Sequence, residues 1–140
     1  DLQAPAVLDQ LLGRVLAARD RIAAEGGRRV PVLVKIAPDI AEDDIAPIVG
    51  RMIARNVDGI IIGNTTLSRH GLRDVEIGRE AGGLSGQPLF HRSVKLADLL
   101  VAAAAADVGI GVLHYDADFD TIAEVLPFES RWIAPRGSLD

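Results

Sequence analysis

Apolar positions along the chain alternate between helical spacing and short continuous runs. Residues 4–25 carry apolar side chains every three or four positions, and Gly26 and Gly27 follow them. This spacing predicts a helix that ends at the two glycines. The apolar run VPVLVKIA, residues 30–37, then predicts a buried strand. Such alternation is typical of parallel strands connected by helices.

The same alternation continues along the rest of the chain. It predicts helices over residues 42–55, 92–107 and 118–126, and strands over residues 58–64, 110–115 and 130–134. The second helix opens with three acids, which its N-terminal dipole favours, and the prediction carries it through Pro47. We therefore predict one α/β domain over residues 1–140, with about four mainly parallel strands in an open sheet or half-barrel.

Composition limits where the protein can act and what it can bind, but it says little about which reaction it could catalyse. The chain has a net charge of −5 and no cysteine, which argues against a broad nucleic-acid-binding face and excludes disulfides and thiolate metal sites. Its longest apolar stretch, LLVAAAAA, is too short to span a bilayer. We expect a cytoplasmic protein with no membrane partner. Because a sheet of only about four strands has unpaired edges and uncovered apolar faces, we also expect a homo-oligomer.

Polar residues follow the predicted strands at the point where each strand ends. Lys35 and Asp39 lie at or just past the end of the first strand, Asn64 and Thr65 at the end of the second, and Asp116 and Asp118 just past the third. In open α/β sheets ligands bind beyond the carboxyl ends of the strands. This edge of the predicted sheet is therefore the candidate site.

Three motifs resemble one enzyme family. VPVLVKIAPDIAEDDIAPIV, VDGIIIGNTTLSR and EAGGLSGQPLF are similar in order and spacing to the class 2, quinone-linked dihydroorotate dehydrogenases, which are FMN-binding (βα)8 barrels. The resemblance implies that Lys35 contacts the flavin ring, that the backbone at Gly63 and Gly86 approaches the flavin, and that Asn64 and Thr65 bind the pyrimidine. A lysine stabilises negative charge on a reduced flavin, an asparagine offers a donor and an acceptor to an imide, and glycine permits close approach.

Two departures from this family bear on activity. The family's catalytic serine has no counterpart in residues 1–140, and Gly63 stands where serine or threonine is more common. The family's glycine-rich phosphate-binding turn is replaced by HYDADFD, residues 114–120. Carboxylates repel a phosphate that backbone amides would bind. Tight binding of FMN in the family's manner is therefore not expected.

Residues 91–140 suggest a second resemblance. HRSVKLADLLVAAAAADVGIGVLHYDADFDTIAEVL and WIAPRGSL are similar to the carboxy-terminal half of PIN-domain toxin ribonucleases. That resemblance implies Mg²⁺ or Mn²⁺ at Asp98, Asp116 and Asp118, with RNA as substrate and an antitoxin as a less favoured partner. On the residues alone, Asp116 or Asp118 capping the following helix explains the same acids.

Together the resemblances suggest a chimera joined near Phe90 and His91. The main interpretation is an α/β domain with no complete active site and no catalysis. The alternatives are an FMN-dependent dihydroorotate dehydrogenase remnant of pyrimidine biosynthesis and a Mg²⁺- or Mn²⁺-dependent ribonuclease fragment. We further expect a weak divalent-ion site at Asp98, Asp116 and Asp118. For this site we predict that the third helix begins near Leu96. We also predict that Lys35 lowers the pKa values of the three acids.

Overall fold

The fold contains two pairs of parallel strands. The structure is a computed structural model, and it describes residues 4–73 and 75–138. Strands β1 (Leu33–Ile36) and β2 (Gly59–Ile62) form one pair, and β3 (Val112–His114) and β4 (Ser130–Trp132) form the other. The predicted α/β class with parallel strands is confirmed. The expectation that all four strands share one open sheet or half-barrel is wrong for the described residues, because β3 pairs with β4 and not with β2.

The helices lie close to the predicted ranges. They are α1 (Pro5–Ala24), α2 (Glu42–Ala54), α4 (Phe90–Val108) and α5 (Asp118–Ala123). The predicted start of the third helix near Leu96 is wrong, because α4 begins at Phe90, directly after a 3-10 turn, η1 (Gln87–Leu89). That turn and the short α3 (Val75–Gly78) lie in a segment for which the sequence predicts no element. No helix in the described ranges is long and apolar enough to cross a membrane.

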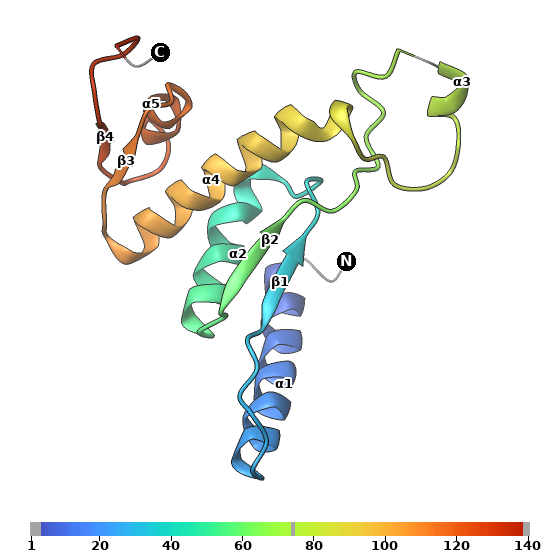
Figure 1. The fold of residues 1–140 in the computed structure, drawn as a ribbon, viewed down its shortest axis with the longest axis vertical. Coiled ribbons are helices and arrows are strands. Elements are labelled where there is room, and N and C mark those ends of the chain that lie inside the picture. Colours follow the sequence, from blue (N-terminus) through green and yellow to red (C-terminus); the bar gives the residue numbers. More distant parts are fainter. Residues whose placement is uncertain (1–3, 74, 139–140) are drawn as a thin grey trace.

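Helices cover only one face of the β1–β2 pair (Figure 1). Strand residues alternate between faces, so Val34 and Ile36 point toward the helices, and Ile36 is 1% exposed. Leu33 and Ile61 point the other way and remain 53% and 42% exposed. The core on the covered face consists of Leu8, Leu12, Leu16, Ile36, Ile45, Ile48, Val49, Met52, Leu96, Leu100 and Ala103. We call the opposite surface, with Leu33, Lys35 and Ile61, the bare face.

Helix α4 separates the two strand pairs. Figure 1 shows β3, β4 and α5 beside the carboxy-terminal half of α4, away from β1 and β2. Leu96, Leu100 and Ala103 of α4 pack into the main core, whereas Ala102 is fully buried against Phe119 and Ile122 of α5. A helix that buries two different stripes of small and apolar residues can serve two cores. The second strand pair therefore packs on α4, and among the described residues β2 has no strand partner besides β1.

Candidate functional site

The carboxyl ends of β1 and β2 bring several of the predicted site residues together. Lys35 pairs in register with Ile61, and both lie on the bare face. The ladder continues one step beyond the strands, because the Asn64 amide donates to the Ile36 carbonyl at 3.2 Å. Gly63, between β2 and Asn64, has a φ of 118°, a backbone conformation that favours glycine. Lys35, Gly63 and Asn64 thus share one end of the β1–β2 pair.

Asp39 ties this end of the sheet to the segment after β2. Its carboxylate accepts hydrogen bonds from the Thr66 hydroxyl at 2.5 Å and from the Leu67 amide at 2.8 Å, and it lies 3.2 Å from the Arg92 guanidinium. Arg92 also donates to the Pro38 carbonyl at 3.0 Å. Partial burial acts to raise the pKa of Asp39, but the hydrogen bonds from Thr66 and Leu67 and the charge of Arg92 outweigh it and lower that pKa.

The chain returns to this site at residues 82–86. The amides of Thr66 and Leu84 donate to each other's carbonyls at 2.9 and 2.7 Å, in an antiparallel bridge. The bridge brings Leu84 beside Thr66, two residues beyond Asn64 along the chain. Gly86 has a φ of 84°, and a side chain on Gly83 would overlap the Thr65 hydroxyl. Asn64, Thr65 and Gly86 are all exposed, so they are open to a ligand.

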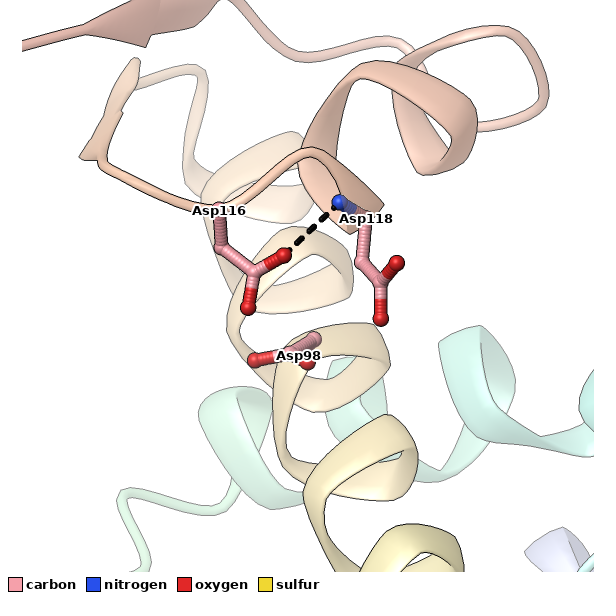
Figure 2. Close-up of side chains that lie close together, drawn as sticks. All are labelled: Asp98, Asp116 and Asp118. Carbon is pink, nitrogen blue, oxygen red and sulfur yellow. Dashed lines mark hydrogen bonds between the residues drawn. The ribbon is translucent and has the colours of Figure 1, made fainter. Parts of the chain in front are cut away.

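The second group of predicted residues also comes together. Asp98 of α4 and Asp116 and Asp118 of the β3–α5 turn each place one carboxylate oxygen within 4.8 Å of the others (Figure 2). Asp116 accepts a hydrogen bond from the Asp118 amide, the first amide of α5, at 2.9 Å. The N-cap residue is Ala117, so neither Asp116 nor Asp118 occupies the N-cap position that the residues alone suggested. A cavity of about 390 Å³ adjoins Asp98 and Asp118 and extends to His91 and Thr121.

Asp98 reaches this acid cluster by a different route from the predicted one. It lies in the third turn of α4, on the stripe that also carries Ala102, and this stripe faces α5. The early start of α4 therefore does not move it away from the other acids. The pKa of Asp98 is raised by burial and by the charges of Asp116 and Asp118. The expectation that Lys35 lowers the pKa values of the acids is wrong for Asp98.

A hydrogen-bonded network around the buried His114 was not predicted from the sequence. His114 is 6% exposed, and its Nδ1 accepts from the Asp116 amide at 3.3 Å. Its Nε2 lies 2.7 Å from the Ser130 hydroxyl, which donates to Asp120 at 3.1 Å. The Trp132 indole also donates to Asp120, at 3.0 Å. These bonds join β3, β4 and α5, so Asp120 serves as an acceptor between elements in addition to lying in the first turn of α5.

Consecutive parallel strands with helices over one face, and polar residues at their carboxyl ends, define a βα-repeat protein with its candidate site at that edge. The family model for dihydroorotate dehydrogenase matches residues 1–112. The chain belongs to the dihydroorotate dehydrogenase family. A dihydroorotate dehydrogenase (quinone) of Sinorhizobium fredii is 51% identical over 124 residues, which are 89% of this chain and 34% of that protein. The corresponding Rhizobium meliloti protein is 55% identical over 93 residues, 66% of this chain and 26% of its own length.

Solved structures agree with this assignment. A crystal structure of DHODH from Eimeria tenella in complex with ferulenol superposes with a TM-score of 0.66 and 26% identity, over 80% of this chain and 33% of that one. A ligand-free form from the same organism gives a TM-score of 0.67 and 30% identity over 76% of this chain and 33% of its own. The chain thus spans about a third of the length of the proteins it matches.

The comparisons change the interpretation of residues 91–140. The dehydrogenase match continues through residue 112, past the join predicted near Phe90 and His91. These comparisons give no support to a PIN-domain segment, a toxin or a chimera. Of the interpretations weighed from the sequence, they favour the dihydroorotate dehydrogenase alternative over a domain without catalysis.

Proposed function

We propose that residues 33–86 supply part of the flavin- and pyrimidine-binding site of an FMN-dependent, quinone-linked dihydroorotate dehydrogenase. The observation that carries this proposal is that Lys35 and Asn64 lie at one end of the β1–β2 pair, next to the bridge that joins Thr66 to Leu84. Membership of the family makes FMN and dihydroorotate the ligands to test first. FMN, when bound, would accept the electrons removed from the pyrimidine.

Each residue has a distinct task in this proposal. Lys35 projects from the bare face and supplies positive charge beside the flavin ring. Asn64 offers a donor and an acceptor to the planar imide, and the Thr65 hydroxyl adds a further hydrogen bond. The backbone at Gly63 and Gly86 permits close approach, since a side chain at either φ would be strained. These tasks are binding and orientation.

The residues after β3 do not fit a phosphate group. Asp116 and Asp118 stand directly beyond the strand, and with Asp98 they place three carboxylates within 4.8 Å of one another. A phosphate brought to this turn would meet repulsion instead of backbone donors. The proposal therefore covers the flavin ring and the pyrimidine, and it assigns no residue of this chain to the phosphate.

Fluorescence titration with FMN and with riboflavin tests both parts of the proposal. We expect the two flavins to bind with similar affinity, because the phosphate gains nothing here. Lys35→Gln should weaken both. Lys95→Gln is the matched control, since Lys95 is an exposed lysine of α4 that pairs with Glu42 at 2.6 Å. Flavin fluorescence that no concentration of protein changes would refute the proposal, and much tighter binding of FMN than of riboflavin would refute the exclusion of phosphate.

A second proposal concerns the acid cluster. We propose that Asp98, Asp116 and Asp118 bind a divalent ion such as Mg²⁺ or Mn²⁺ weakly, since hard cations prefer carboxylate oxygens. The supporting observation is their geometry, together with an Asp98 Oδ2 that is buried and has no hydrogen-bond partner among the described residues. RNA cleavage is not proposed. Added Mn²⁺ should broaden NMR signals of these three residues first; broadening elsewhere, with these unaffected, would contradict the proposal.

A further inference from the structure

Arg69 gathers five backbone carbonyls around one guanidinium group. Its Nε donates to Gly78 at 3.0 Å, and its Nη2 donates to Glu80 at 2.9 Å and to Gly82 at 2.7 Å. Its Nη1 donates to Leu67 at 3.3 Å and to Thr66 at 3.5 Å. The acceptors lie on both the outgoing and the returning part of the segment between β2 and α4. One side chain therefore holds the two parts together.

No other residue type can make this set of bonds. Arginine carries five N–H donors in a fixed plane, whereas lysine has three donors on a single atom. The Gly78 carbonyl lies at the end of α3, the Thr66 carbonyl lies in the bridge to Leu84, and the other three belong to bends outside the named helices and strands. Arg69 is partly buried, so these charge-assisted bonds are partly sheltered from water. The returning segment consequently depends on Arg69 for its conformation.

The held segment is the one that faces the proposed pyrimidine site. Thr66, whose carbonyl accepts from Arg69, also forms the bridge to Leu84, and the neighbouring Gly83 lies against the Thr65 side chain. Asp39 fixes the same segment from the other side, through the Thr66 hydroxyl and the Leu67 amide. Arg69 itself lies beyond the bridge, and its described hydrogen bonds all go to backbone carbonyls of this segment. Its effect on a ligand would act through Thr65, Asn64 and Gly86.

We propose that Arg69 is a positioning residue, which fixes residues 82–84 against Thr65 and Thr66 and so sets the geometry of the pyrimidine site. This inference rests on the proposed function. It predicts that losing the guanidinium loosens the bridge at Thr66 and Leu84 first, and that the site loses affinity for a pyrimidine carboxylate as a result. The main core, which Arg69 does not contact, should keep its stability.

The experiment uses the full chain with Arg69→Ala, Arg69→Lys and the control Arg79→Ala. Arg79 is an arginine of the same segment, but it is 71% exposed and its described ion pair is with Glu76 alone. Amide hydrogen exchange is measured by NMR at Thr66, Leu67 and Leu84, with amides of α2 as the internal reference. Orotate, a pyrimidine carboxylate, is then titrated while the signals of Asn64 and Thr65 are followed.

We expect exchange at the three amides to become faster by about tenfold or more in Arg69→Ala, because several charge-assisted hydrogen bonds are lost. Arg69→Lys should restore little of the protection from exchange. Arg79→Ala should exchange at the same rate as the unsubstituted chain. Orotate should bind more weakly to Arg69→Ala while exchange in α2 is unchanged. Unaltered exchange at the three amides would overturn the inference, whatever orotate does.

Two further results separate this inference from the proposed function. If orotate binds the unsubstituted chain and Arg69→Ala equally well while exchange is faster, Arg69 is purely structural and the positioning role is refuted. If orotate does not bind the unsubstituted chain, the pyrimidine proposal fails, and with it the positioning role for that ligand. In that case, faster exchange in Arg69→Ala would still show that Arg69 holds the segment.

Discussion

Replacing Asp39 with asparagine should destabilise the protein at neutral pH. The Asp39 carboxylate accepts one hydrogen bond on each oxygen, from the Thr66 hydroxyl and from the Leu67 amide. An asparagine has one carbonyl oxygen and an NH₂ group, so it can accept only one of these bonds in the same geometry. Either the Thr66 hydroxyl or the Leu67 amide then faces another donor.

The expected loss follows from the contacts that disappear. A hydrogen bond to a charged group contributes about 1.5–3 kcal/mol. The ion pair with Arg92 adds less than about 1 kcal/mol, because its side chains are 45% and 30% exposed and water screens the charges. We therefore expect Asp39→Asn to lower the free energy of unfolding by about 2–3 kcal/mol. Asp43→Asn, at an exposed acid in the first turn of α2, should cost less than about 1 kcal/mol from the helix dipole.

The pH dependence of the difference in stability between the unsubstituted chain and Asp39→Asn is a stricter test. The pKa of Asp39 is lowered from its ordinary value of 3.8, so the folded state binds fewer protons than the unfolded state near that pH. The stabilisation by the carboxylate is complete well above pH 3.8 and is lost as the pH falls through the lower, folded-state pKa. Urea unfolding at pH 7 and at successively lower pH should show the two proteins converging. Equal stability at pH 7, or a difference that acid leaves unchanged, would refute the reasoning.

Three other changes test separate parts of the structure. Asp98→Asn should stabilise the protein at pH 7 by about 1 kcal/mol, since it removes repulsion from Asp116 and Asp118. Because the pKa of Asp98 is raised in the folded state, this gain should vanish below pH 3.8, the ordinary pKa of an aspartate. Urea unfolding that shows destabilisation at pH 7 would contradict this prediction. Gly83→Ala should lower the free energy of unfolding by about 1–3 kcal/mol in the same assay, because the methyl group of the alanine would overlap the Thr65 hydroxyl. We also propose that the bare face drives self-association: sedimentation should show oligomers that Leu33→Lys disperses, and only monomer at micromolar concentration would count against it.

The individual elements of this fold were predictable because each has a local cause. The leucines of α1 repeat at helical spacing, and Gly26, with a φ of 95°, follows the helix that it was predicted to end. How the strands pair was not predictable in the same way. The apolar run of β3 would suit the edge of β2 or a partner such as β4 equally well. The choice depends on packing against Ala102 of α4, which is a tertiary contact and leaves no periodic signal.

The candidate site was predictable to the extent that it follows strand ends. Lys35, Asn64 and the acids after β3 were selected because loops at the carboxyl ends of parallel strands converge. Arg69 and His114 were not selected. Arg69 binds backbone carbonyls, which every residue has, and His114 binds a serine and an amide from other elements. Neither arrangement imposes a spacing on the sequence, so only the folded structure reveals it.

The position of α4 explains how one chain holds two chemically opposite strand ends. The ends of β1 and β2 carry Lys35, Asn64 and an Asp39 carboxylate that pairs with Arg92, whereas the end of β3 carries carboxylates that raise the pKa of Asp98. In one continuous sheet these ends would share an edge, and a lysine would partly neutralise the acids. Because α5 packs on the far stripe of α4, Asp98 instead meets only like charge among the groups that shift its pKa. The two proposed ligands follow this difference in charge, because a flavin and a pyrimidine carboxylate are proposed for the first end and a divalent cation for the second.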